Sequence, residues 1–459
     1  MDLVRVVFCD PHGLARSKTL AAESFRHVLR HGIDFSPGPF LFDTGHAVAV
    51  DFLAGDPGVG VSEIAGAGDF VVVPDPSTFQ LLPSVEPRTA WVIGDEFLRD
   101  GTRHPLSSRD VLRRIAGRFE EHAVAPVIGL EIEWYLTISS GGPPGYAGNG
   151  FGTQGRAPAV HPVNAGYQFN LDTYLDSVAD VVGPLSVMLG HLGLPLRSME
   201  HESGPGQLEF TFEPLSATDA ADAALLFRTF VKQFCRRRGF HASFMALPGL
   251  ESFDPSGWHL HQSVVRTDRG TNSFAPAEPA TDDLSPQGRA YVRGVLDQAR
   301  DFCILAVPTI NGYRRFRPEF VLSPTRIEHS VEDRSAMVRV QGEGDSTHIE
   351  NRIGEPCANP YLYIASQLSA GLDGMTGSSR PGAESSHAPV PALPTSLREA
   401  LDAFCGSDRA SDLLGRPLML TLARLKASEV ARYEAWAADA APSPDGVTEW
   451  EQREYFEIY

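Results

Sequence analysis

The segment Val127–Leu136 places two carboxylates inside an otherwise apolar strand, and no other feature constrains the fold as much. Its residues, Val-Ile-Gly-Leu-Glu-Ile-Glu-Trp-Tyr-Leu, have the β-branched and aromatic content of a strand. Alternate side chains share a face, so Glu131, Glu133 and Tyr135 point to the same side. Neighbouring carboxylates repel each other unless they are protonated or bridged by a cation. The segment is therefore either an edge strand with one solvated face or a wall of a cation site.

A second pair of acids flanks a turn in Met199–Phe210. The residues Ser-Gly-Pro-Gly join two strand-like pieces, which predicts a hairpin with Glu202 and Glu209 as cross-strand neighbours. Gly204 and Gly206 would let a ligand approach the backbone closely. A polar turn with ordinary solvated acids is the alternative.

Two later segments add histidines, an acid and an arginine. In Gly257–Val265 one strand face carries His259, His261 and Ser263. Imidazole is the commonest metal ligand, although such a pair could equally be core or surface residues.

In His348–Tyr361, Glu350 and Arg352 share a strand face, before Asn359 and Pro360 begin a helix as its cap and first residue. A surface ion pair ahead of a capped helix is the alternative for this segment.

A basic region follows the histidine segment, and three arginines in it, Arg315, Arg334 and Arg339, could fork onto phosphate or carboxylate oxygens. The chain has 39 basic and 58 acidic residues and a net charge of −19, so clustered arginines favour a function, with solvated arginines as the alternative. Oxygen-rich ligands with one imidazole suit Mg²⁺ or Mn²⁺. Together the segments predict two such cations beside a phosphate-binding wall, as phosphoryl transfer from a nucleotide requires.

The pattern along the chain predicts an α+β protein with a boundary near residue 103. Before it come short strands with Gly and Pro between them, at Leu3–Cys9, Ala47–Phe52, Phe70–Val73 and Ala90–Gly94. After it a helical pattern begins at Pro105–Ser107, and long helices are predicted at 171–193, 216–237, 286–305, 359–374 and 420–438. Segments rich in Gly, Pro, Ser or Ala predict mobile loops at 139–166, 266–286 and 376–394.

Composition excludes several classes of function. The acidic charge argues against nucleic acid or an anionic membrane as main partner. The five cysteines are scattered without a CxxC motif, which favours a reducing cytoplasm. We expect neither a secretory signal nor a membrane span, since the chain has no long apolar run.

Taken in order, these segments resemble the glutamine synthetase superfamily, from about residue 3 to the C-terminus. The resemblance implies a β-grasp-like N-terminal domain, residues 1–103, and a catalytic domain, residues 104–459, with a curved antiparallel sheet. It also implies a homo-oligomeric ring, with twelve subunits as the expected number, whose sites are completed by the neighbour's N-terminal domain.

The resemblance assigns roles position by position. The first metal would be held by Glu133, Glu202 and Glu209, and the second by Glu131, His259 and Glu350. His261 and Ser263 match nucleotide contacts, and Arg334 and Arg339 match arginines that steady the transferred phosphoryl group. Arg315 and Arg352 match residues that hold the amino-acid carboxylates, with Arg352 also placed among the catalytic arginines. The implied reaction has two steps: a carboxylate attacks the γ-phosphate of ATP, and an amine nitrogen then displaces phosphate.

The sequence departs from glutamine synthetases at the two acids that bind ammonium. The first acid's place in Gly32–Pro39 is taken by Ser36. The second acid is expected six residues after Arg315, where Val321 stands, and Glu319 comes two residues early. A desolvated ammonium ion needs these anions, whereas an organic amine with an apolar body does not. A displaced loop that brings Asp34 or Glu319 into place is the alternative.

A smaller departure lies on the acid-substrate side, where Asp254-Pro-Ser-Gly257 replaces the family's Asn-Gly-Ser-Gly. The carbonyl of Pro255 could still receive the substrate's ammonium group. We therefore predict an ATP-dependent ligase that joins glutamate to an organic amine, such as a polyamine, alkylamine or arylamine. Glutamine synthetase with ammonium is the alternative enzyme, and a catalytically silent ring of the same fold is the alternative of another class.

Overall fold

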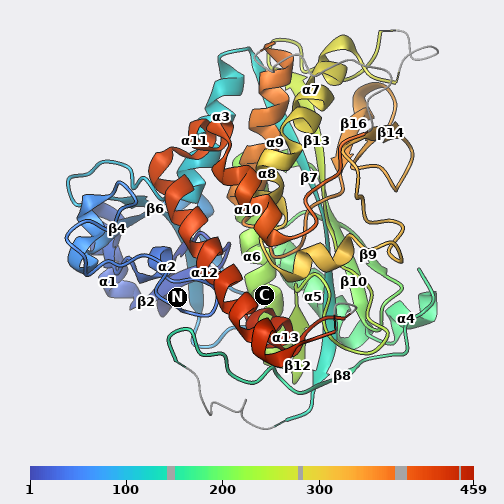
Figure 1. Ribbon diagram of the computed structural model, residues 1–459. Coiled ribbons are helices and arrows are strands. Elements are labelled where there is room, and N and C mark those ends of the chain that lie inside the picture. The colour runs from blue at the N-terminus through green and yellow to red at the C-terminus, as the bar shows by residue number, and fades with distance from the viewer. Residues whose placement is uncertain (142–149, 278–282, 378–389, 444–445) are drawn as a thin grey trace.

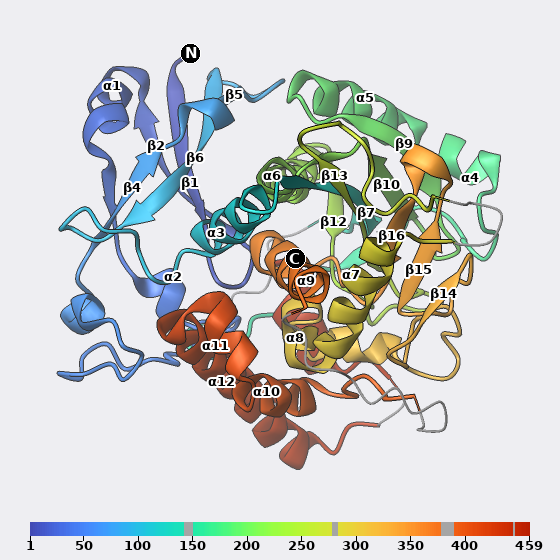
Figure 2. The same ribbon diagram turned by 90° about the horizontal axis from the view of Figure 1, so that it is seen from above.

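Two β-sheets organise the chain in a computed structural model that describes residues 1–141, 150–277, 283–377, 390–443 and 446–459 (Figure 1). The first sheet takes its six strands from residues 3–97, and the second takes its ten strands from residues 124–351. Seen from above, helices α3 and α6 lie between the two sheets (Figure 2). The α+β class and the large curled antiparallel sheet are thus as predicted.

The N-terminal sheet has the strand order β2-β1-β6-β4-β3, with β5 paired to β6. β1 runs antiparallel to β2 and parallel to β6, the arrangement of a β-grasp fold. Phe8 packs against Phe35, Phe40 and Phe70 in its core. The elements are β1 Leu3–Cys9, β2 Ala15–Ala21, α1 Ala22–His31, β3 Ile33–Phe35, α2 Gly38–Leu41, 3₁₀ helix η1 Ser62–Ala67, β4 Phe70–Pro74, η2 Pro76–Thr78, β5 Gln80–Leu81 and β6 Thr89–Phe97.

One predicted strand of this region, Ala47–Phe52, is wrong. Only Val48 forms a bridge there, an isolated one to Phe42. The Asp51 carboxylate accepts hydrogen bonds from the backbone N–H groups of Leu53 and Ala54, which turns the chain and ends the extended conformation.

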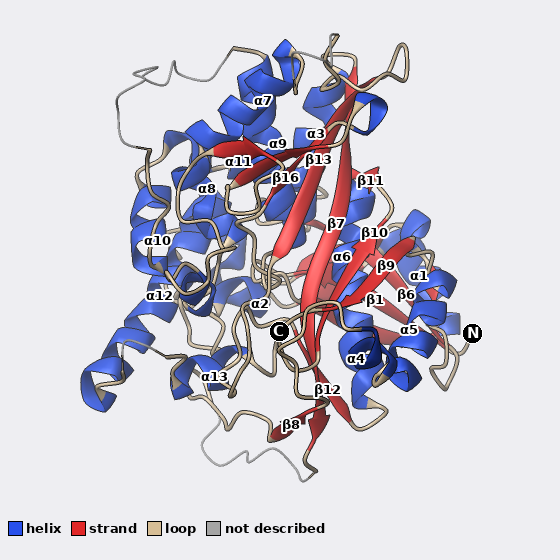
Figure 3. Cartoon of the chain, turned by 90° about the vertical axis from the view of Figure 1, so that its right-hand side faces the viewer, coloured by secondary structure: helices blue, strands red, loops and turns tan. Residues whose placement is uncertain are grey.

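The second sheet has the order β14-β15-β16-β13-β7-β10-β9, and β8, β11 and β12 also pair with β7. Only β14 and β15 run parallel among its described strands. The central strand β7 spans 16 residues and runs the height of the molecule (Figure 3). The strands are β7 Val124–Ser139, β8 Val160–Pro162, β9 Leu196–His201, β10 Gln207–Phe212, β11 Leu215–Ser216, β12 Phe240–Ser243, β13 Trp258–Arg266, β14 His329–Val331, β15 Val338–Gln341 and β16 His348–Asn351.

Helices cover one face of this sheet. Ile132 and Trp134 point from β7 into that buried face, so the predicted alternation along β7 is observed. The helices are α3 Ser108–Glu120, α4 Asp172–Asp176, α5 Ala179–His191, α6 Ala217–Arg236, α7 Pro286–Asp297, α8 Ala299–Ala306, η3 Asn311–Arg315, η4 Gly344–Ser346, α9 Pro360–Met375, α10 Leu397–Cys405, α11 Asp408–Leu414, α12 Arg416–Ala440 and α13 Glu449–Tyr455. Within the described residues, none of them combines the length and apolarity of a bilayer-spanning helix.

Two predicted long helices are each broken in two. The segment 171–193 divides into α4 and α5, because Val178 leaves the helical region with φ −115° and ψ 8°. The segment 286–305 divides into α7 and α8 at Gln298, with φ −106°. Parts of the predicted loops, residues 142–149, 278–282 and 378–389, lie outside the described residues.

An ion cluster around the buried Arg109 joins the N-terminal sheet to helices α3 and α6, and we call it the arginine hub. Arg109 of α3 donates to Asp95 at 2.6 Å and to Asp75 at 3.0 Å, both in the N-terminal region. The same guanidinium donates to Asp222 of α6 at 2.6 and 3.0 Å. The predicted boundary after residue 103 falls between β6 and α3, and it stays a prediction.

Candidate active site

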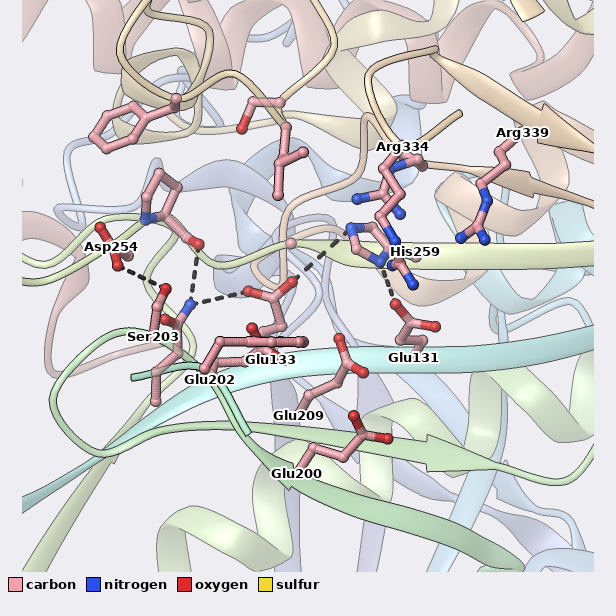
Figure 4. Close-up of a pocket in the computed structure, with 18 of the residues that line it drawn as sticks. Glu131, Glu133, Glu200, Glu202, Ser203, Glu209, Asp254, His259, Arg334 and Arg339 are labelled. Carbon is pink, nitrogen blue, oxygen red and sulfur yellow. Dashed lines mark hydrogen bonds and ion pairs between the residues drawn. The ribbon is translucent and has the colours of Figure 1, made fainter. Parts of the chain in front are cut away.

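Strand register gathers the predicted acids and histidines on the open face of the large sheet (Figure 4). β13 pairs with β7 so that His259 lies opposite Glu131. β10 pairs with β7 on its other side, so that Glu209 lies opposite Glu133. β16 then pairs with β13, which sets Glu350 opposite His261. Antiparallel pairing thus converts separate sequence motifs into one acidic surface.

The hairpin register differs from the predicted one, and it brings a further acid, Glu200, into the cluster. Glu209 lies opposite Glu200, not Glu202. The turn closes through a hydrogen bond from the Gln207 N–H to the Gly204 oxygen, which leaves Glu202 beside the turn. Glu200 and Glu202 alternate on one strand face in the same way as Glu131 and Glu133, and this was the signal in the sequence that could have identified Glu200.

Three overlapping groups of side chains have ligand atoms within 4.8 Å of one another. One group is Glu131, His259 and Glu350, the residues predicted for the second metal. The three predicted first-metal ligands are divided between the other two groups, Glu133–Glu209–His259 and Glu200–Glu202–Glu209. Oxygen ligands with a single imidazole fit Mg²⁺ or Mn²⁺, and these residues would hold it.

The carboxylates of this cluster cannot all be ionised without a counter-charge. Burial and the neighbouring Glu202 raise the pKa of Glu133 to about 8. Burial and Glu200 raise the pKa of Glu202 to about 7. For Glu209, burial followed by Glu131 raises the pKa to about 11. A divalent cation would remove this repulsion, so the donor set fits a metal site.

Glu131 behaves differently because two imidazoles face it. Although burial opposes ionisation, His259 and His261 hold the pKa of Glu131 well below its usual range. Nδ1 of His259 contacts one carboxylate oxygen, and Nε2 of His261 lies 3.0 Å from the other. Behind them, Nε2 of His348 lies 3.1 Å from Nδ1 of His261.

Gln207 links the acid cluster to the predicted glutamate site. Its Nε2 donates to Glu133 at 3.0 Å and to the Pro255 carbonyl at 3.0 Å. A carbonyl oxygen has two lone pairs, so Pro255 can still accept from an ammonium group. Beside it, Ser203 Oγ donates to the Asp254 carboxylate at 2.7 Å (Figure 4).

The four predicted arginines line the same cavity. Arg315 is buried and donates to the carbonyls of Ile353 and Gly354 at 3.0 and 2.8 Å. Arg352 contacts Glu350, and Arg339 donates to it at 3.3 Å. Three of these guanidinium groups keep a buried Nε without a hydrogen bond: Arg315, Arg339 and Arg352. Such N–H groups are available to an anionic ligand.

The cavity has a volume of about 880 Å³, and its flap side combines a run of apolar residues with one acid, Glu319, which the sequence offered as the alternative ammonium ligand. Phe320, Val321 and Leu322 of the flap and Phe169 of the opposite loop form its apolar wall. Val321 is 71% exposed and Phe169 62% exposed, which is unusual for side chains of this kind.

Two predicted site residues lie elsewhere. Ser263 lies on β13 opposite Val127 and is not among the residues that line the cavity. Ser36 is exposed on the N-terminal sheet region and does not line this chain's own cavity. The sequence interpretation had placed Ser36 in a neighbouring subunit's site, which a single chain does not test.

An acid cluster on a sheet, facing four arginines across one cavity, is the charge arrangement expected of a metal-dependent enzyme that transfers phosphoryl groups. Residues 105–443 match the family described as "Glutamine synthetase, catalytic domain". The chain therefore belongs to the glutamine synthetase family, whose members are ATP-dependent ligases that use divalent metal ions.

Similar proteins include ligases for different nitrogen donors. The chain is 39% identical to "Gamma-glutamylanilide synthase" from Acinetobacter sp, over 100% of this chain and 93% of that protein. It is 29% identical to "Gamma-glutamylethanolamide synthetase GlnA4" from Streptomyces coelicolor, with the same coverage of 100% and 93%. It is 28% identical to "Glutamine synthetase" from Methanosarcina mazei, over 95% and 92%.

Two solved structures share the fold over nearly the whole chain. "Apo GmaS without ligand" has a TM-score of 0.77 at 24% identity, covering 99% of this chain and 96% of that chain. "Crystal structure of novel glutamine synthase homolog" has a TM-score of 0.79 at 22% identity, covering 100% and 98%.

Proposed function

We propose that this protein is an ATP-dependent ligase that forms a γ-glutamyl amide from glutamate and an organic amine. One observation carries the proposal: the apolar residues Phe320 and Val321 line the catalytic cavity, and Val321 stands at the position where a glutamine synthetase has an acid. Glu319, two residues earlier, also lines the cavity, but its carboxylate lies 3.8 Å from the guanidinium group of Arg317, which offsets its charge. The names of the anilide and ethanolamide relatives support an organic nitrogen donor.

The proposed reaction follows from the charges around the cavity. Bound metal ions would neutralise negative charge on the ATP phosphates. Arg334 and Arg339 would donate to the transferring phosphoryl group, and Arg315 and Arg352 would hold the glutamate carboxylates. The γ-carboxylate attacks the γ-phosphate, which gives γ-glutamyl phosphate and ADP. The uncharged amine nitrogen then attacks the acyl carbon, phosphate leaves, and the amine loses its proton.

The apolar wall gives the amine its selectivity. Apolar surface contributes about 25 cal/mol per Å² on burial, so an amine that buries roughly 100 Å² against Phe169 and Val321 gains about 2.5 kcal/mol. Ammonium has no such surface. We therefore expect kcat/KM for the best organic amine to exceed that for ammonium by at least ~30-fold at equal pH.

The test is phosphate release from ATP with glutamate, measured across aryl-, alkyl- and polyamines and ammonium. Release with organic amines supports the proposal. Release with ammonium alone would restore glutamine synthetase, and the absence of release with every donor on the panel would support a catalytically silent ring. The variant Ser36→Asp with Val321→Glu should shift preference toward ammonium, because it puts back the two anions.

Finer features belong to the same proposal. We infer two Mg²⁺ or Mn²⁺ ions per site, with Glu200 as a ligand in addition to the six predicted from the sequence. His261 and Ser263 would contact the nucleotide. A homo-oligomeric ring, expected to be a dodecamer, would bring Ser36 of one subunit to the next subunit's cavity, in the cytoplasm.

A further inference from the structure

A second cavity, of about 700 Å³, lies at the end of β7 and shares no lining residue with the catalytic cavity. Its walls come from the start of β2, the C-terminal half of α6, strand β12 and residues 457–459. In Figure 3, β12 lies at the lower end of β7.

This cavity is basic although the chain is acidic. Five of its described lining residues carry positive charge and one carries negative charge: Arg16, Arg156, Arg228, Lys232 and Arg236, with Glu457. With a net charge of −19 over the chain, chance would favour the opposite balance.

Two of the five cations already have protein partners for their charge or their hydrogen bonds. Arg16 forms an ion pair with Asp10 at 2.6 Å. Arg228 donates to three backbone oxygens, those of Gly13, Pro356 and Ala358, at 2.6–2.8 Å. These two side chains therefore have structural roles.

Of the other three cations, Lys232 also has partners. It donates to the Ala242 carbonyl and to an oxygen of Tyr459, the last residue of the sequence. Burial lowers the pKa of Lys232 to about 8, although the nearby Glu457 carboxylate opposes this shift. Within the described residues, the side chains of Arg156 and Arg236 form neither a hydrogen bond nor an ion pair, although both line the cavity. The excess positive charge of this cavity therefore lies on Arg156 and Arg236.

The rest of the wall is apolar. Phe240 and Phe244 line it beside Lys232, and Phe244 is fully buried at 1% exposure. A cavity of this volume, with aromatic walls and a few polar groups, is typical of a small-molecule site.

We propose that this cavity binds a small organic anion, a carboxylate or phosphate monoester on an apolar body, with its head group held by Arg156 and Arg236. The body would pack against Phe240 and Phe244. Charge-assisted hydrogen bonds would give the affinity, and the aromatic wall would select against small inorganic anions.

The test is calorimetric titration of the full-length protein with phenyl phosphate and, separately, phenylacetate. Saturating Mg–ADP and glutamate keep both probes out of the catalytic cavity. We expect at least one probe to bind with a dissociation constant below about 1 mM, and Arg156→Gln with Arg236→Gln to weaken it at least ~10-fold. The probe that binds tells a phosphate site from a carboxylate site. This double variant should keep its basal ligase rate.

Two controls keep the result specific. Arg237→Gln removes the neighbouring exposed charge, which does not line the cavity, and should leave probe binding unchanged. Arg334→Gln in the catalytic cavity should also leave it unchanged. The proposal is overturned if neither anion binds, if uncharged benzyl alcohol binds equally well, or if affinity falls with Arg334→Gln and not with the double variant.

Discussion

Two buried charge clusters of this protein differ in whether the chain itself completes them. The arginine hub sets three guanidinium groups against three carboxylates: Arg103, Arg109 and Arg113 with Asp75, Asp95 and Asp222. Although burial opposes it, hydrogen bonds from Ser77 and Arg109 lower the pKa of Asp75 to about 2. Asp222 is buried more deeply, so burial raises its pKa even beside Arg109. The hub ties the N-terminal sheet to helices α3 and α6, and its charges are matched within the chain.

The acid cluster on the large sheet, by contrast, has more negative charge than the chain itself balances. Burial and mutual repulsion raise the pKa values of Glu133, Glu202 and Glu209, even though Arg315 acts on Glu133 and Arg334 on Glu202. Folding tolerates this arrangement because cations can supply the missing charge. Buried charge with matching partners therefore indicates structure in this protein, and buried charge without partners indicates a ligand.

The largest expected effect separates activity from stability at the acid cluster. Glu209→Gln or Glu133→Gln removes an anionic ligand at nearly constant volume, and we expect the ligation rate to fall at least ~10³-fold. The metal-free variants should melt no lower than the unsubstituted protein, because without metal near neutral pH these carboxyl groups are protonated and a neutral amide replaces a neutral acid. Steady-state kinetics and a thermal melt in EDTA measure both. The exposed Glu213, which follows β10, gives the control variant Glu213→Gln. If Glu209→Gln or Glu133→Gln kept near-normal turnover, the assignment of that residue as a metal ligand would be wrong.

At the arginine hub we expect a loss of stability without a loss of ligation rate. Arg109→Gln leaves buried Asp222 without its cation, so the free energy of unfolding should fall by about 3–5 kcal/mol. The part that stays folded should keep its ligation rate.

Arg113→Gln is the matched control for Arg109→Gln. Its side chain is 29% exposed and its partners keep Arg109, so the loss should be about 0–1 kcal/mol. Urea denaturation checks both variants, and equal losses would show that the hub does not depend on burial.

Arg339, which lines the catalytic cavity, can be compared directly with Arg109 of the hub. Arg109 uses all three of its nitrogens on protein carboxylates, whereas Arg339 keeps a buried Nε without a partner. Lysine cannot reproduce the guanidinium fork on phosphate oxygens, so Arg339→Lys should lower kcat about 10²-fold with little change in melting temperature. An unchanged kcat would mean that Arg339 only pairs with Glu332 and Glu350.

The sequence predicted the residues of the acid cluster better than their register. Strand alternation is local, so the shared face of Glu131 and Glu133 could be predicted from a single segment. The turn after Glu202 depends on which of several Gly and Pro residues closes it, and the pattern allows more than one register. For that reason Glu200, opposite Glu209, was missed.

Long-range features were predicted less well. The six charges of the hub come from five separate elements or loops, and no spacing in the sequence connects them. The break between α4 and α5 depends on the backbone at Val178, where the sequence shows continuous apolar periodicity. The role of Ser36 depends on a neighbouring subunit and stays a prediction.

The smallest expected effect is a pH dependence of metal stabilisation. The folded-state pKa of Glu202 is raised to about 7 and that of Glu133 to about 8, both above the unfolded value of 4.5. Between pH 4.5 and 8 the metal-free folded protein therefore binds more protons than the unfolded chain, and its stability falls as pH rises. Mg²⁺ or Mn²⁺ binds the ionised acids, so its stabilising effect should grow over the same interval by about 1.4 kcal/mol per pH unit for each proton released. In a chain of 459 residues that corresponds to roughly 1 °C per kcal/mol, so the melting shift caused by metal should be a few degrees larger at pH 8 than at pH 6.

Differential scanning fluorimetry with and without metal measures this shift. The variant Glu133→Gln should make the shift depend less on pH. A metal-induced shift that is the same at both pH values would mean that these acids are already ionised, and that the second cluster is as complete as the first.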